Sequence, residues 1–359
     1  MTLAEELVRH VRESPLAEPL GDGRIRCLAC GHRCPIFPGL PGVCKVRFND
    51  NGRLMAPHGY VNALHLDPIE KKPFFHALPG ARALSFGMLG CDLHCAYCQN
   101  WLSSQALRDP RADVYFQPLR AAEIVQQALN SGSQCLVSTY NEPLITAEWA
   151  VEIFRQARRH RLVTGFVSNG NATPEVLDYL RPWLDLFKVD LKSFRDENYR
   201  KLGGRLAPVL DSIRRIHAMG FWLEVVTLVV PGFNDSPEEL GGIARFLASV
   251  SPDIPWHVTA FHPDYKMTAP PPTGITELLR AVAAGHEAGL RYVYAGNLAG
   301  RAGDLENTRC WNCGATLIER YGFRVLSNRL APGGRCPACA ARIAGFWEAP
   351  PRAAGGEEP

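Results

Sequence analysis

Residues 90–100 read GCDLHCAYCQN and space three cysteines, Cys91, Cys95 and Cys98, as C-x3-C-x2-C. A [4Fe–4S] cluster is held by thiolates and normally takes four of them. Three closely spaced cysteines therefore predict a cluster with one iron left open to an exogenous ligand. A zinc knuckle is the alternative, but zinc favours paired C-x2-C knuckles with four ligands in total, and this loop offers no local fourth ligand.

Outward from this loop, short apolar runs alternate with helical patterns, which is typical of βα units around a parallel sheet. We expect strands at residues 83–88, 135–138, 163–167, 186–191, 223–230 and 256–261, with a short terminal one at 291–294. Six units are fewer than the eight of a closed barrel, so the sequence predicts an α/β fold with a partial (βα)6 barrel. Ligands of such folds lie at the C-terminal edge of the strands, and the cysteine loop directly follows the first strand.

Eight further cysteines form two groups outside this core. The group near the end, Cys310, Cys313, Cys336 and Cys339, consists of two C-x2-C knuckles separated by a strand-forming stretch, and it predicts a structural zinc ribbon. The group near the start, Cys27, Cys30, Cys34 and Cys44, has an irregular spacing for both zinc and ferredoxin clusters. For this quartet we favour structural zinc over an auxiliary [4Fe–4S] cluster. Cys135 stands alone, as expected of a buried structural thiol.

These groups divide the chain into four parts. We expect an N-terminal extension with a cysteine quartet at residues 1–80, a core barrel at 81–300 and a zinc-ribbon-like module at 301–348. The tail, residues 349–359, is rich in Pro, Ala, Gly and Glu, and we expect it to be disordered.

Composition limits the classes of partner and the cellular compartment that we expect for this chain. The 359 residues include 39 basic and 36 acidic side chains, for a net charge of +3, and bulk binding of nucleic acid needs a concentrated basic patch instead. No apolar stretch is long enough to cross a bilayer, and the first residues lack the apolar region of a signal peptide. We therefore expect a cytoplasmic protein without nucleic-acid or membrane partners. In a reducing compartment, clustered cysteines indicate metal binding.

With its aromatic residue before the last cysteine, the loop of residues 90–100 resembles the cluster loop of radical S-adenosylmethionine (SAM) enzymes. The resemblance implies that SAM chelates the open iron and that electron transfer splits it into methionine and a 5′-deoxyadenosyl radical. The N-terminal quartet, residues 67–76, the loop and the double knuckle recur in the same order in the radical SAM component of the AmmeMemoRadiSam system, which is related to pyruvate formate-lyase activating enzyme. This resemblance spans residues 26–347 and implies Memo-type and AMMECR-type partners and a reductant such as flavodoxin or ferredoxin.

Polar residues follow several predicted strands and supply partners for SAM. Residues 138–143 resemble the Gly-Gly-Glu-Pro segment that receives the methionine ammonium in this superfamily, with Tyr140 and Asn141 in place of the two glycines; a helix cap is the alternative role for Glu142. Asp190 and Lys192 lie two apart, hence on one face of a strand. The activating enzymes also hold a monovalent cation near here, but Val167 replaces an expected aspartate. The expected cofactor-binding residues are Tyr97, Thr139, Tyr140, Asn141, Glu142, Ser168, Asn169, Asp190, Lys192 and His262, with Tyr97 near adenine and His262 on the ribose by resemblance.

Three functional hypotheses follow from these patterns. The first is a radical enzyme that activates or modifies a protein, in the manner of glycyl-radical activation. The second is a radical enzyme that acts on a small molecule or lipid. The third is a non-catalytic zinc scaffold in which the three-cysteine loop holds a structural metal.

Overall fold

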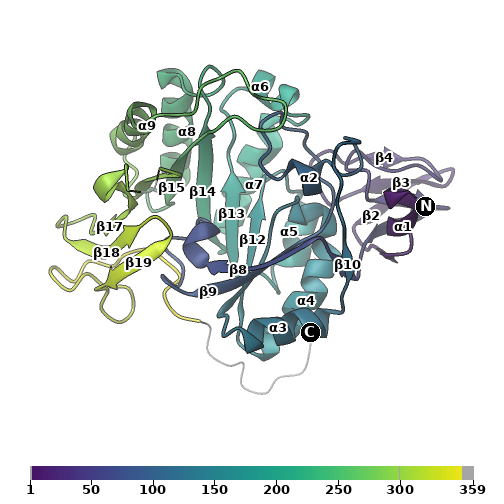
Figure 1. Cartoon of the computed structure of the whole chain (residues 1–359), viewed down its shortest axis with the longest axis horizontal. Coiled ribbons are helices and arrows are strands. Elements are labelled where there is room, and N and C mark those ends of the chain that lie inside the picture. The colour runs from purple at the N-terminus through teal and green to yellow at the C-terminus, as the bar shows by residue number, and fades with distance from the viewer. Residues whose placement is uncertain (1, 299, 350–359) are drawn as a thin grey trace.

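The computed structural model describes residues 2–298 and 300–349, and a single large sheet forms the centre of the molecule (Figure 1). Its eight strands lie in the order β16-β15-β14-β13-β12-β11-β9-β8. All neighbours pair in parallel except β8, which pairs antiparallel with β9 at one edge. The strands are β8 (Ala63–Pro68), β9 (Arg82–Gly87), β11 (Cys135–Ser138), β12 (Val163–Ser168), β13 (Leu186–Asp190), β14 (Trp222–Val229), β15 (Trp256–Ala260) and β16 (Val293–Gly296).

The strands expected from the apolar runs are confirmed, with ends that shift by no more than two residues. β8 lies inside the stretch that we expected to be an N-terminal extension, residues 1–80, but it belongs to the core sheet. β8 and β16 form the two edges of this sheet, and they do not pair with each other within the described ranges. The sheet is therefore open.

Helices between the strands pack on one face of the sheet. They are α3 (Ala121–Asn130), α4 (Ala147–Arg159), α5 (Pro174–Leu180), α6 (Asp196–Lys201), α7 (Leu206–Ala218), α8 (Pro237–Val250) and α9 (Ile275–Glu287). Their caps follow the sequence: the Ser236 side chain accepts a hydrogen bond from the Glu239 amide at the start of α8. Gly132, which follows α3, has φ +64°, a conformation that glycine adopts without steric cost.

The opposite face of the sheet is closed at the N-terminal ends of the strands by residues 69–77. Ile69, in the short helix η1 (Ile69–Lys71), and Phe74 pack against Ala83, Val137 and Leu186 of three strands.

The buried carboxylate of Glu224 holds this closing segment in place. It accepts the amide hydrogens of Phe75 and His76 at 2.9 and 2.8 Å, and its Oε2 lies 2.7 Å from Nε2 of His257. The C-terminal ends of the strands are thus left as the open end of the sheet.

Two small β-rich regions lie at opposite ends of the molecule's long axis (Figure 1). The N-terminal region contains α1 (Leu3–Leu7) and the sheets β2-β3-β4 and β1-β6-β5, and β7 pairs with β10. Their bounds are β1 (Val11–Glu13), β2 (Ala17–Gly21), β3 (Arg24–Cys27), β4 (Pro35–Ile36), β5 (Phe48–Asp50), β6 (Arg53–Pro57), β7 (Tyr60–Val61) and β10 (Gln117–Pro118).

The C-terminal region contains η3 (Gly303–Glu306) and the sheet β17 (Thr308–Arg309), β18 (Thr316–Tyr321) and β19 (Arg324–Asn328). Of the tail expected to be disordered, residues 350–359 lie outside the described part of the chain. None of the described helices is both long and apolar enough to cross a membrane.

Candidate active site

The cysteine loop begins directly after β9, at the open end of the sheet. Gly90, the residue before Cys91, has φ +93° and is tightly enclosed: a Cβ on this residue would lie 2.8 Å from Cγ1 of Val46 and 3.2 Å from the carbonyl oxygen of Cys44. Only glycine fits here without displacing its neighbours. The N-terminal region therefore fixes the path of the loop.

Cys91, Cys95 and Cys98 line one cavity of about 430 Å³. The Leu93 amide donates to the Cys91 sulfur at 3.4 Å, and the Cys98 sulfur lies 3.2 Å from the Ser104 hydroxyl. Burial raises the pKa of all three thiols, that of Cys95 to about 12. Without a metal these thiols stay protonated, and bound iron would stabilise them as thiolates. The lining drawn from the described residues contains these three cysteines and no fourth, which fits a cluster with one open iron.

Glu142 lies at the end of β11 and faces the same cavity. Its carboxylate accepts hydrogen bonds from the Ser168 hydroxyl at 2.7 Å, the Asn169 amide at 2.7 Å and the Leu144 amide at 3.0 Å. Burial, followed by the nearby charge of Asp92, raises the pKa of Glu142 to about 8. A cation placed here would compensate this burial, so the site suits an ammonium group. The Leu144 contact shows that the capping role is present as well.

Tyr140 occupies the position of the first glycine in the Gly-Gly-Glu-Pro segment that residues 138–143 resemble. It has φ +73°, a left-handed conformation that costs a bulky residue on the order of 1–3 kcal/mol. Its hydroxyl accepts a hydrogen bond from the Lys72 ammonium at 3.0 Å, and its ring packs edge-on against His65. Asn141 is held by the Met88 amide, which donates to its side-chain oxygen at 2.9 Å. Contacts from the edge of the sheet thus maintain the strained turn.

Asp190 ends β13 between two lysines. Its oxygens contact the ammonium groups of Lys188 and Lys192, the latter at 3.2 Å. Burial would raise the pKa of Asp190, but the two ammonium groups hold it at about 2. Both carboxylate oxygens are thus engaged by lysine ammonium groups. Lys188 was missed, although it lies on the same strand face as Asp190 and Lys192 by simple alternation.

The structure gathers nine of the ten expected SAM-binding residues around the cavity and leaves His262 aside. The nine that line it are Tyr97, Thr139, Tyr140, Asn141, Glu142, Ser168, Asn169, Asp190 and Lys192. The His262 side chain is 59% exposed, and its Nδ1 lies 3.1 Å from the amide nitrogen of Gln99, which does line the cavity. The Tyr97 ring packs edge-on against Phe233, beyond the end of β14.

Asp92, inside the cysteine motif, is a residue that sequence analysis did not assign. It is fully buried and accepts hydrogen bonds from the side-chain amides of Asn169 at 2.6 Å and Asn171 at 2.7 Å. His32 lies with its Nε2 3.1 Å from the Asp92 carbonyl oxygen. Asp92 therefore links the cysteine loop both to the end of β12 and to the N-terminal region. The sequence could have indicated this role, because Asp92 is an acidic residue between Cys91 and Cys95 of the motif.

Comparisons with known proteins agree with this geometry. The radical SAM superfamily profile matches residues 87–247. An uncharacterized protein of Methanocaldococcus jannaschii is 37% identical over 336 residues, which cover 93% of this chain and 99% of that protein. The chain belongs to the radical SAM superfamily.

More distant relatives include activating enzymes. The pyruvate formate-lyase-activating enzyme of Staphylococcus epidermidis is 25% identical over 194 residues, covering 51% of this chain and 76% of that enzyme. A crystal structure of a radical SAM methyltransferase from Sphaerobacter thermophilus aligns with 63% of this chain and 70% of that one, with 15% identity and a TM-score of 0.48.

Membership in the radical SAM superfamily makes the chain an enzyme of a family that uses SAM and a [4Fe–4S] cluster. The cavity fits both groups, since it combines three thiols with a buried carboxylate suited to an ammonium. The hypothesis of a non-catalytic zinc scaffold does not agree with this membership.

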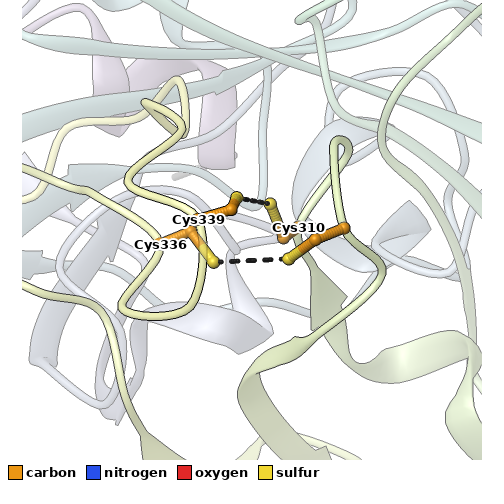
Figure 2. A group of neighbouring side chains, drawn as sticks. Cys310, Cys336 and Cys339 are labelled. Atoms are coloured by element: carbon orange, nitrogen blue, oxygen red, sulfur yellow. Dashed lines mark hydrogen bonds between the residues drawn. The ribbon is translucent and has the colours of Figure 1, made fainter.

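The C-terminal cysteines of this radical SAM protein form a compact second site. The sulfurs of Cys310, Cys313, Cys336 and Cys339 all lie within 4.8 Å of one another. Cys310 and Cys339 are 3.6 Å apart, as are Cys313 and Cys336, so each close pair joins the two knuckles (Figure 2). This is the spacing of four thiolates that share one tetrahedral metal ion.

Proposed function

We propose that this chain reductively cleaves SAM at a [4Fe–4S] cluster held by Cys91, Cys95 and Cys98, and that it uses the resulting radical to activate or modify a protein. The observation that carries the proposal is the shared cavity, which three thiols and the Glu142 carboxylate line together. The cavity lies at the open end of the large sheet. An open sheet of this kind is consistent with the expected partial (βα)6 barrel.

When bound, the cluster supplies one electron and SAM supplies the 5′-deoxyadenosyl radical. The protein's own residues bind and orient SAM. Glu142 binds its ammonium group, and Ser168 and Asn169 hold that carboxylate in place through hydrogen bonds of 2.7 Å each. Lys192, fixed by Asp190, offers a positive charge on the same wall of the cavity. Tyr97 packs near the adenine, and His262 would have to turn from Gln99 to reach a ribose.

The names of the activating-enzyme relatives favour a protein substrate over a small molecule or lipid. The cavity of about 430 Å³ lies within the range of about 300–1,000 Å³ that is typical of pockets for small molecules and cofactors, which suits SAM. The order of the motifs favours a partner protein of the Memo or AMMECR type, and the activating-enzyme relatives favour a flavodoxin or ferredoxin as reductant, in the cytoplasm.

The enzyme's SAM cleavage tests the proposal. The anaerobically reconstituted chain, reduced with dithionite, should convert SAM to 5′-deoxyadenosine, measured by liquid chromatography with mass detection. Cys95→Ala should abolish the product, because the thiolate ligates iron. Cys135→Ala is the matched control, since Cys135 is equally buried but lies in β11 outside the cavity lining. Product from Cys95→Ala, or none from iron-loaded wild type, would overturn the assignment. Deuterium transfer from a labelled candidate protein into 5′-deoxyadenosine then identifies the partner.

A further inference from the structure

The N-terminal cysteines form a buried group beside the active site. Cys27 ends β3, Cys30 and Cys34 lie in the following loop, and Cys44 precedes β5. The Cys27 amide donates to the Cys34 carbonyl oxygen at 3.0 Å. Burial and then the charge of Cys27 raise the pKa of Cys44 to about 11, so these thiols lie near one another in a poorly solvated place. Cys34 alone of the four is partly exposed.

The spacing of these four thiols differs from that of the C-terminal quartet. In the described part of the chain, the C-terminal quartet is the one group of three or more Cys, His, Asp or Glu whose ligand atoms all lie within 4.8 Å of one another. No three of the N-terminal thiols lie within this limit of one another, and neither do Cys91, Cys95 and Cys98. Thiolates that share one zinc ion lie close together, whereas those of a cubane cluster bind different irons and are more widely separated.

Arg47 provides an independent sign of a missing acceptor. It is 1% exposed, and its guanidinium donates to Glu148 twice at 2.8 Å. Its Nε–H is buried and has no hydrogen-bond partner among the described residues. Besides Glu148, the charges of Cys27 and Cys44 act on this guanidinium. A buried donor without an acceptor is costly, and a cluster with four thiolates would supply an anionic sulfur acceptor at this place.

The group also touches the radical cluster loop at several points. The Cys44 carbonyl oxygen packs against Gly90, the neighbour of Cys91. The Gly31 amide, next to Cys30, donates to the Asn171 carbonyl oxygen at 2.8 Å, and Asn171 in turn donates to Asp92 at 2.7 Å. The N-terminal cysteines and the cysteines of the loop are therefore connected through directly packed backbone. Only one or two residues lie between a cysteine of one group and the contact with the other.

We propose that Cys27, Cys30, Cys34 and Cys44 bind a second [4Fe–4S] cluster that relays electrons to the first. The relay role rests on the proposed function, whereas the metal site does not. A low-potential one-electron donor, of the flavodoxin or ferredoxin class, gives one electron to the second cluster near partly exposed Cys34. The same electron passes to the cluster on Cys91, Cys95 and Cys98 and then to SAM, so the second cluster returns to its oxidised state. This proposal replaces the structural zinc that we expected at this quartet.

Two variants of the full chain separate the sites. In Cys91→Ala/Cys95→Ala/Cys98→Ala, reconstituted with iron and sulfide, about four irons per chain should remain, with an EPR signal after dithionite reduction that SAM does not change. In Cys27→Ser/Cys30→Ser, about four irons should also remain, but SAM should change the signal. Cys135→Ala is the control and should keep the full iron content. If the triple variant binds zinc instead of iron, the proposed second cluster is overturned. The triple variant alone decides this question, even if the Cys27→Ser/Cys30→Ser variant fails to fold.

Electron donors then test the relay. The double variant should still make 5′-deoxyadenosine with dithionite, which reaches clusters directly, but should lose at least about tenfold in rate with enzymatically reduced flavodoxin. An unchanged rate with flavodoxin would overturn the relay. If the triple variant holds a cluster but wild type never cleaves SAM, the proposed function fails while the second site stands.

Discussion

Each end of this chain carries four clustered cysteines, and the two quartets differ in structure. The sulfurs of the C-terminal four lie within 4.8 Å of one another, and Cys310 and Cys336 belong to a small separate core with Tyr292 and Tyr294. Among the described residues, no three of the N-terminal cysteines meet this limit, and the carbonyl oxygen of Cys44 packs on Gly90 in the loop that carries Cys91. Under the proposed assignments, the distance between thiols and the identity of their neighbours distinguish a structural metal from an electron carrier better than spacing in the sequence.

Removal of the C-terminal metal site should cause the largest loss of folding stability. It should leave the iron content of the protein unchanged. Cys336→Ser/Cys339→Ser should abolish binding of about one zinc per chain, and structural zinc sites contribute on the order of 10 kcal/mol to the folding of small modules. We expect residues 308–347 to become sensitive to limited proteolysis. Metal analysis should show unchanged iron, and a loss of iron in this variant would contradict the separation of the two ends.

The buried ion pair under the N-terminal quartet should have the next largest effect. Glu148→Gln removes the charge that faces Arg47, and loss of one partner of a buried pair costs about 3–5 kcal/mol. Urea unfolding should show this loss, and iron should be lost from the N-terminal site while zinc stays. The matched control is Asp211→Asn, whose exposed pair with Arg215 is worth less than about 1 kcal/mol. Equal effects of the two variants would contradict the account.

A pH-dependent contact attaches the C-terminal end and should give the smallest effect. Nδ1 of His76 lies 2.7 Å from the Ala344 carbonyl oxygen, and its ring packs on Trp347. Burial lowers the pKa of His76 from 6.5 to about 4, although Glu224 opposes this shift and Arg320 and His257 support it. The unfolded chain therefore binds a proton between pH 6.5 and 4 that the folded chain excludes.

The His76 contribution to stability is thus complete above pH 6.5 and declines as the pH falls towards 4. A shift of this size corresponds to about 3 kcal/mol. As the pH falls from 6.5 to 4, the difference in unfolding free energy between wild type and His76→Gln should shrink by this amount. Loss of zinc at low pH affects both proteins equally, so it cancels in the difference. Parallel curves would show that His76 is already charged in the folded protein.

Much of the fold could be predicted because the parallel strands are buried on both faces and read as apolar runs. β11, at Cys135–Ser138, was predicted to the residue. β8 was missed because it is an edge strand whose residues are half-buried or exposed, and nothing in its sequence marks it as part of the core. The pleat of β13 places Lys188 and Asp190 on one face, and Lys192, two residues beyond Asp190, lines the same cavity as expected.

The rest of the site depends on contacts that the sequence does not encode locally. His262 lies two residues beyond the end of β15, its side chain is 59% exposed, and it contacts Gln99 of the cavity lining without lining the cavity itself. The role of Asp92 emerges only when Asn169 and Asn171 arrive from the end of β12. The spacing C-x2-C-x3-C-x9-C could not tell zinc from a cluster, because the separation of the thiols is set by how the loop folds.

The metal content of the anaerobically purified and reconstituted wild-type chain tests the central comparison most directly. Iron, acid-labile sulfide and zinc should be measured on the same protein sample. The account predicts about eight irons and one zinc per chain, from two cubane clusters and one tetrahedral site. About four irons and two zincs per chain would contradict it, because both quartets would then hold the same structural ion.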